Sequence, residues 1–136
     1  MANASRLFPT VDHQELIVIN GAEVLARPNE ISLYWQSIVE GGITGICSDN
    51  CQLIAWFRRF REDVHLVHVT SASDIQQAKT EGKLGLIFHL QKPPLELAVS
   101  PDEAWNLHQL GVRIVQLTYN GRSLFGDGCT ERIDGG

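Results

Sequence analysis

The sequence predicts an α/β fold made of parallel β/α units, equivalent to half of a TIM-like (β/α)8 barrel. Short apolar runs of strand length alternate along the chain with segments whose apolar residues recur every three or four positions. The clearest unit spans residues 83–120, where a strand, a loop, a helix and a second strand follow one another. Two strands joined through a helix are expected to lie parallel with a right-handed crossover. The alternation occurs four times with the last helix missing, which fits half of an eight-stranded barrel or a small open sheet.

The first half of the chain begins with an arm and continues with strands and helices in alternation. Residues 1–14 show no sustained period and are predicted to form an N-terminal arm, and residues 15–136 one partial barrel domain. A glycine pair is expected to stop the first helix, and Asp49 and Asn50 to cap the second. The predicted elements are strands at 15–20 and 43–48, a helix that starts at 28–30, and a helix over 51–61.

The second half contains the central unit. Ser73 and Gln76 have the spacing of a capping box and predict a helix that closes at the next glycine. Residues 84–90 are apolar on both sides, as in a buried parallel strand. Ser100 followed by Pro101 predicts the start of the next helix. The remaining predicted elements are a short strand or extended connection over 64–69, a helix over 101–110, a strand over 112–120 and a terminal loop over 121–136.

Composition and charge limit the classes of function. With 136 residues, 43% hydrophobic and 20% charged, the chain has the composition of one globular domain. A formal charge of -5 argues against a nucleic-acid partner, and the arginines at 58, 59 and 61 are interpreted as a solvated helix face. No apolar run approaches the ~20 residues of a membrane span and no signal pattern is seen, so no membrane partner and a cytoplasmic location are expected. Three cysteines argue against a disulfide framework, and their spacing argues against a zinc site.

An ordered series of motifs points to a protein family. The sequence has GKLGLI at 82–87, LGVRIVQLTYN at 110–120 and DGC at 127–129. With these motifs, and over most of its length from Leu16, it resembles the membrane (renal) dipeptidase family of zinc peptidases. The resemblance implies an eight-stranded barrel roughly two and a half times as long as this chain, which would match its N-terminal half. It also implies a hydrolase that cleaves dipeptides at a binuclear zinc site.

The residues at the family's zinc positions differ in this chain. By the resemblance, the family's His-x-Asp pair falls on Ala22 and Val24, and its bridging glutamate falls on Gln91. Alanine and valine have no donor atom, and a neutral amide is a poor bridge between two dications. A substrate-contacting histidine of the family corresponds to Tyr119, so Gln91 and Tyr119 are the position-equivalent candidates for catalytic residues. The sequence therefore predicts a divergent member that binds no zinc or other cofactor and has no peptidase activity as it stands.

Polar side chains cluster near the predicted carboxyl ends of the strands, where parallel α/β sheets bind ligands. They are interpreted as a polar pocket for a small molecule or dipeptide; the alternative is strand-end residues that bond to loop backbone or solvent. Arg113 and Arg122 could hold a carboxylate, although Arg113 could equally pair with a helix acid. The candidate ligand-binding residues are Asn20, Glu23, His89, Gln91, Tyr119, Asn120 and Asp127.

Three functions follow from the sequence. The chain is a fragment of a dipeptidase-like hydrolase, a non-catalytic small-molecule-binding module, or a self-associating half barrel. Four parallel strands cannot close a barrel, so both outer strands keep unpaired edges. We therefore expect a homo-oligomer or a complex with a complementary barrel half. Ile114, Val115, Leu117 and the third strand are expected near the contact, and the N-terminal arm could cover an edge.

Overall fold

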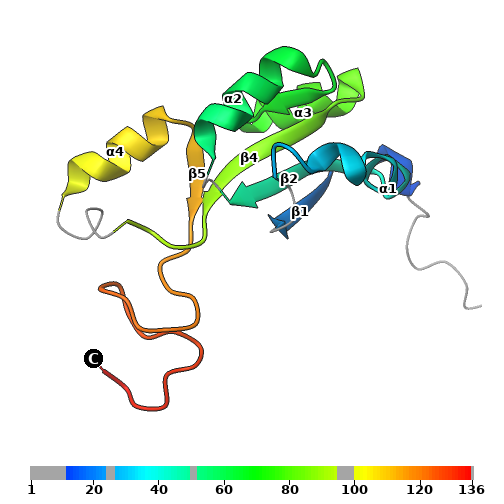
Figure 1. The fold of residues 1–136 in the computed structure, drawn as a ribbon. Coiled ribbons are helices and arrows are strands. Elements are labelled where there is room, and N and C mark those ends of the chain that lie inside the picture. The colour runs from blue at the N-terminus through cyan, green and yellow to red at the C-terminus, as the bar shows by residue number, and fades with distance from the viewer. Residues whose placement is uncertain (1–11, 24–26, 50–51, 95–99, 136) are drawn as a thin grey trace, which may run out of the picture.

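A computed structural model describes residues 12–23, 27–49, 52–94 and 100–135, and Figure 1 shows their arrangement. The described part contains one five-stranded sheet in which every pair of strands is parallel. This alternation of parallel strands with helices confirms the α/β class and is consistent with a partial TIM-like barrel. The strands are β1 (Val18–Glu23), β2 (Ile43–Asp49), β3 (Leu66–His68), β4 (Leu84–Leu90) and β5 (Val112–Val115). The helices are α1 (Trp35–Glu40), α2 (Leu53–Glu62), α3 (Ala72–Glu81) and α4 (Pro101–Gln109), with short 3-10 helices η1 (His13–Glu15) and η2 (Ile31–Leu33).

Strand β4 is the centre of the sheet. It pairs with β2 along one edge. On its other edge it pairs first with β3, at Leu84 to Leu86, and then with β5, at Phe88 to Leu90. Strand β1 pairs with β2 and forms the opposite border. Strands β3 and β5 therefore follow one another along the same edge of β4. For residues 64–69 the sequence predicted either a short strand or an extended connection, and β3 is the short strand.

The strand order determines which face each helix covers. Helices α1, α2 and α4 connect strands in one direction across the sheet, whereas α3 leads back from β3 to β4. Because such connections are right-handed, α3 lies on the opposite face from the other three helices. We call the two surfaces the α2 face and the α3 face.

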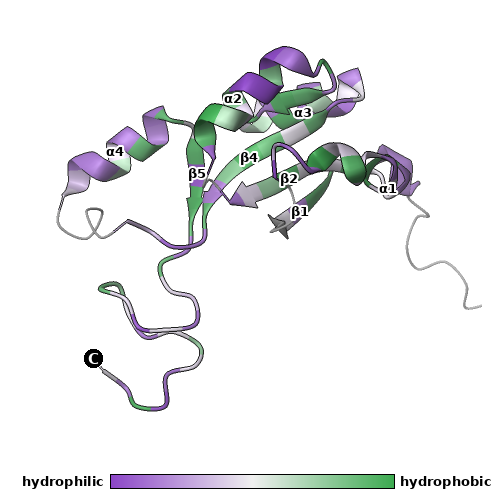
Figure 2. Ribbon diagram, viewed as in Figure 1, coloured by the Kyte–Doolittle hydropathy of each residue, from purple (hydrophilic) through white to green (hydrophobic). Residues whose placement is uncertain are grey.

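The packing of the core agrees with this division. Figure 2 shows β4 as apolar along most of its length, so it supplies both faces. The α3 face has a smaller cluster, in which Cys47, Val69 and Ile87 pack with Ile75 of α3. The α2 face has the larger cluster, which comprises Ile31, Ile38, Ile46, Trp56, Leu66, Leu84, Leu86, Phe88 and Val112.

The N-terminal elements begin later than predicted. The side chain of Asp12 accepts a hydrogen bond from the backbone N–H of Gln14 (2.9 Å), which folds the next residues into η1. The first strand therefore begins at Val18 and not at residue 15. Pro28 to Glu30 form a turn, so the predicted helix start at 28–30 was also early. Most of the predicted arm, residues 1–14, lies outside the described residues.

The capping box of α3 is two residues upstream of the predicted one. The hydroxyl of Ser71 accepts from the Asp74 N–H (3.3 Å), and the Asp74 carboxylate accepts from the Ser71 N–H (2.8 Å). The same carboxylate also accepts from the N–H of Thr70 (2.8 Å), and these bonds hold the pKa of Asp74 below its usual value. A carboxylate is a stronger acceptor than the amide of Gln76, which explains why the box at Ser73 was wrong.

Strand β5 ends at Val115, before the predicted end at residue 120. Its partner β4 ends at Leu90, and one further bond, from the Gln116 N–H to the Leu90 carbonyl (2.9 Å), continues the pairing. Beyond that point β4 has ended, so β5 has no partner strand with which to continue the hydrogen-bond ladder. Residues 117–135 form a loop, as expected for 121–135 but not for the residues just before it.

Candidate functional site

The carboxyl ends of β2, β4 and β5 meet at one edge of the sheet. Asp49 of β2 and Ile114 of β5 are both register partners of His89 in β4. Residues an even number of positions apart in a strand face the same side of the sheet. His89 is four positions after Gly85, which faces Ala78 of α3, so His89 and its register partners lie on the α3 face. Parallel α/β sheets bind ligands at this kind of edge.

His89 is the most unusual polar group of this edge. Its side chain is 5% exposed, and its Nδ1 has no hydrogen-bond partner within the described part of the chain. Buried polar atoms in folded proteins nearly always have a partner. A ligand atom that bonds to Nδ1 would therefore relieve an existing desolvation cost.

Gln91 and Asp49 join the ends of the two central strands. The backbone N–H of Gln91 donates to Oδ1 of Asp49 (3.4 Å), and both residues are half-buried. Sequence reasoning assigned Asp49 to a helix cap and missed it as a site residue. The signal that identifies it is its position at the end of β2, directly beside His89 in the parallel register.

Strand β1 contributes the predicted residues Asn20 and Glu23 to the same sheet. Asn20 is half-buried, pairs with Ile46 in register and makes an interaction of its own. Glu23 is the last residue of β1 and is the register partner of Ser48, one residue before the end of β2. Of the family's zinc positions, Ala22 lies in β1, and Val24 lies outside the described residues.

The predicted site residues Tyr119, Asn120 and Asp127 belong to the C-terminal loop. The carbonyls of Tyr119 and Asn120 accept from the N–H groups of Cys129 (2.8 Å) and Thr130 (2.9 Å). Figure 1 shows this loop extending past the carboxyl ends of the strands. Within the described residues, no hydrogen bond links these three residues to β4.

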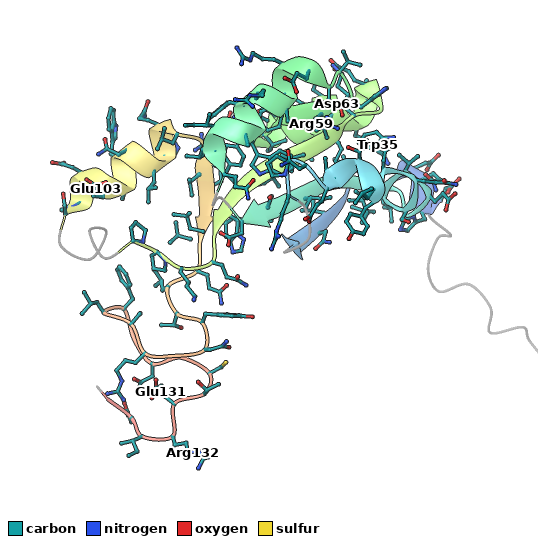
Figure 3. All side chains as sticks on the ribbon, in the orientation of Figure 1. Trp35, Arg59, Asp63, Glu103, Glu131 and Arg132 are labelled. Carbon is teal, nitrogen blue, oxygen red and sulfur yellow. The ribbon has the colours of Figure 1, made fainter. Side chains whose placement is uncertain are left out.

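The Asp127 carboxylate has its partners inside the same loop. It accepts from the Gly135 N–H (2.8 Å) and pairs with Arg122, and these contacts, the Gly135 N–H first, hold the pKa of Asp127 below its usual value. Figure 3 shows Glu131 and Arg132 farther along the loop.

The structure therefore separates the predicted residues. His89 and Gln91 lie at the end of β4, and Tyr119, Asn120 and Asp127 lie in the loop. Asn20 is the register partner of Ile46, a residue of the α2-face cluster, so it lies on the opposite face of the sheet from His89.

The two arginines considered for a carboxylate ligand are both engaged within the chain. Arg113 donates to the carbonyls of Thr70 (2.7 Å), His108 (2.8 Å) and Val112 (2.8 Å), so it bonds to neither a helix acid nor an open site. It fastens the end of β3 to the start of β5. Arg122 does hold a carboxylate, that of Asp127 in its own loop.

Other chemistry-bearing groups of the described residues are dispersed. No three His, Cys, Asp or Glu side chains among them are grouped so as to hold a metal ion. Cys47 is buried, which raises the pKa of its thiol, and Cys129 is exposed in the loop. Within the described ranges, no helix is long and apolar enough to cross a membrane.

The parallel sheet with its intervening helices places this chain among α/β proteins and is consistent with a partial TIM-like barrel. No family model and no curated protein matches the sequence. Among solved structures, the chain is similar to an amidohydrolase from Pseudomonas aeruginosa, with a TM-score of 0.68 and 27% identity over 91% of this chain. The chain spans 40% of the length of that protein. The likeness supports an amidohydrolase-like fold and does not single out the dipeptidase family.

Proposed function

We propose that this chain is an amidohydrolase-like half barrel whose sheet edge binds a small amide or dipeptide, without a zinc centre of its own. The likeness to the Pseudomonas aeruginosa amidohydrolase carries the proposal. The sheet edge supports it, because His89 presents a buried and unpartnered nitrogen at the level where such folds bind ligands.

The chemistry of the edge suits an amide. An amide group has one carbonyl acceptor and N–H donors, and an imidazole nitrogen donates to the first if it carries a proton or accepts from the second if it does not. The Gln91 side chain offers both a donor and an acceptor, and Asp49 adds a carboxylate beside it. Hydrolysis in metal-dependent enzymes of this kind uses a metal-activated water, and Ala22 has no atom with which to hold a metal.

Metal analysis and a binding assay on one preparation test the proposal. The chain is purified with added zinc, its metal content is measured, and L-alanyl-L-alanine is titrated by calorimetry and assayed for hydrolysis. We expect saturable binding, no stoichiometric zinc and no hydrolysis above a blank. His89→Asn should weaken binding about tenfold, whereas His108→Asn, on the exposed side of α4, should not. Two tightly held zinc ions per chain, or hydrolysis that a chelator abolishes, would contradict it.

Self-association is a second candidate, which the two borders of the sheet favour. Ile19 in β1 and Ile114 in β5 are 42% and 40% exposed, and each lies on the α3 face of an outer strand. Leu117, just after β5, is also exposed. Unpaired strand edges and exposed apolar side chains at a sheet border are commonly covered by another chain. Light scattering at micromolar concentration should show a dimer or a larger assembly, and a stable monomer that binds no hydrophobic dye would contradict this.

A further inference from the structure

A groove on the α2 face is separate from the sheet edge. It has a volume of about 610 Å³, within the range of small-molecule sites. His68, at the end of β3, lines it on the sheet side, and the other lining residues come from α2. It is on the opposite face of the sheet from His89. We call this the α2 groove, formed by Ile54, Phe57, Arg58, Phe60, Arg61 and His68.

The floor of the α2 groove is aromatic. The rings of Phe60 and His68 stack at 5.5 Å between centroids, and Phe57 meets each of them edge to face at 6.2 and 5.5 Å. Phe57 is nevertheless 40% exposed and Ile54 is 81% exposed. The apolar side of α2 is therefore wider than the sheet covers, and its outer part is open to a ligand.

The rim of the groove is cationic. The arginines of α2 divide into two kinds: Arg58 and Arg61 are exposed, as the interpretation of a solvated face expects, whereas Arg59 is half-buried and paired. Arg59 is held by Asp63 (3.0 Å) and Ser32 (2.8 Å), and Figure 3 shows it beside Asp63. Arg58 and Arg61 line the groove, are exposed, and form no ion pair or hydrogen bond within the described residues, not even with the neighbouring Glu62.

These two arginines define the charge of a suitable ligand. They are three positions apart on a helix, so their guanidinium groups lie on neighbouring parts of one surface. A guanidinium pairs well with a carboxylate, and the pair is stronger beside an apolar surface that excludes water. The net charge of the chain is -5, so this site is locally positive on a protein that is negative as a whole.

We propose that the α2 groove binds a small aromatic carboxylate. The aromatic ring of the ligand packs on Phe57 and Phe60, in the stacked and edge-to-face geometries that the groove already uses. Its carboxylate lies between Arg58 and Arg61. This binding goes beyond the function proposed above, because it uses the other face of the sheet and needs no amide.

Calorimetric titration with phenylacetate tests the proposal. Phenylacetamide has the same ring without the charge, and cyclohexylacetate has the charge without the aromatic ring. We expect phenylacetate to bind saturably, phenylacetamide at least tenfold more weakly, and cyclohexylacetate with intermediate affinity. Arg58→Gln and Arg61→Gln should each weaken phenylacetate about tenfold, whereas Arg132→Gln, an exposed arginine of the C-terminal loop, should not.

Three outcomes would overturn the proposal. The first is the absence of saturable phenylacetate binding. The second is equal affinity for phenylacetate and phenylacetamide, or an equal loss in the Arg132 and Arg58 variants. The third is an assembly that dissociates in the Arg58 and Arg61 variants and is unaffected by phenylacetate, because a second copy would then occupy the groove. Circular dichroism and the urea midpoint confirm that each variant folds, and the comparison of the three ligands on the unmodified chain does not depend on any variant.

Discussion

The two faces of the sheet are packed with side chains of different size. On the α2 face, Trp56 of α2 and Phe88 of β4 are fully buried among large aliphatic residues. On the α3 face, Gly45 and Gly85 are register partners without side chains, and Gly85 lies close to Val69 and to Ala78 of α3. Strand β4 therefore packs against large side chains on the α2 face and against small ones on the α3 face, and we call the latter the thin layer.

The difference shows which face contributes most of the hydrophobic stabilisation. Large buried side chains contribute most of the hydrophobic stabilisation of a small domain, and the α2 face holds nearly all of them. The α3 face lacks such bulk, and α3 covers the strands at the level of Gly85, toward their amino ends. The carboxyl ends on this face hold the polar group that includes His89. The following substitutions test this division.

The largest effect is expected on the α2 face. Trp56→Ala should lower the free energy of unfolding by about 3–5 kcal/mol, because it removes a fully buried indole and leaves a cavity. Trp105→Ala, on the exposed side of α4, should change it by less than about 0.5 kcal/mol. Urea unfolding followed by circular dichroism measures both. Equal effects would show that α2 does not anchor the core.

The thin layer predicts opposite results for its two glycines. A Cβ at Gly85 would lie 2.6 Å from Cγ2 of Val69, so Gly85→Ala should cost about 1–3 kcal/mol of stability. A Cβ at Gly45 would meet no atom nearer than 3.6 Å, so Gly45→Ala should be neutral or slightly stabilising. The same urea experiment compares them. If both variants are as stable as the unmodified chain, Val69 is not packed closely against Gly85 of β4.

A smaller effect is expected at the start of α3. Ser71→Ala removes the side-chain half of the capping box and should lower stability by about 1 kcal/mol. Ser73→Ala, at the position that the sequence pattern favoured, should have a clearly smaller effect, because its hydroxyl bonds to Ser71 and not to a helix N–H. Thermal unfolding of the two variants side by side decides between the two caps.

The sequence predicts the class of the fold well, because the apolar pattern of a strand and the three-to-four-residue period of a helix are local properties. The short run of residues 84–90, apolar on both sides, identifies β4, and the Ser100-Pro101 pair locates the start of α4. The order of the strands is not local. The helix preceding β4 lies on the opposite face because β3 pairs with the far edge of β4, and no pattern within either segment encodes that pairing.

The candidate ligand-binding residues stay a prediction, and the same distinction between local and non-local properties applies to them. His89 and Gln91 are identified by their position at the end of a buried strand, which is a property of one segment. Asp49 was missed because its role depends on the register between β2 and β4. Asp127 was grouped with the strand ends by its position after β5, but its carboxylate bonds to Arg122 and Gly135 in the loop.

The smallest expected effect concerns His68, which lies under α2 at the junction of β3 and β5. Burial among Phe57, Phe60 and Phe88 lowers the pKa of His68, and the nearby Arg113 lowers it further. A histidine whose pKa is lower in the folded state stabilises the fold fully above its unfolded pKa of about 6.5. The contribution is lost as the pH falls below that value, because the unfolded chain then binds the proton more readily.

The pH dependence of unfolding tests this on the intact chain. The urea midpoint should decrease as the pH is lowered from about 7.5 to about 5. This window lies above the range in which an aspartate such as Asp74 begins to titrate. His68→Gln should flatten the dependence in this window, whereas His108→Gln, whose side chain is exposed on α4, should leave it unchanged. A midpoint that rises on acidification, or an equal slope in all three proteins, would show that His68 is not buried against the aromatic cluster. In that case the α2 face would be more open at β3 than the ring contacts imply.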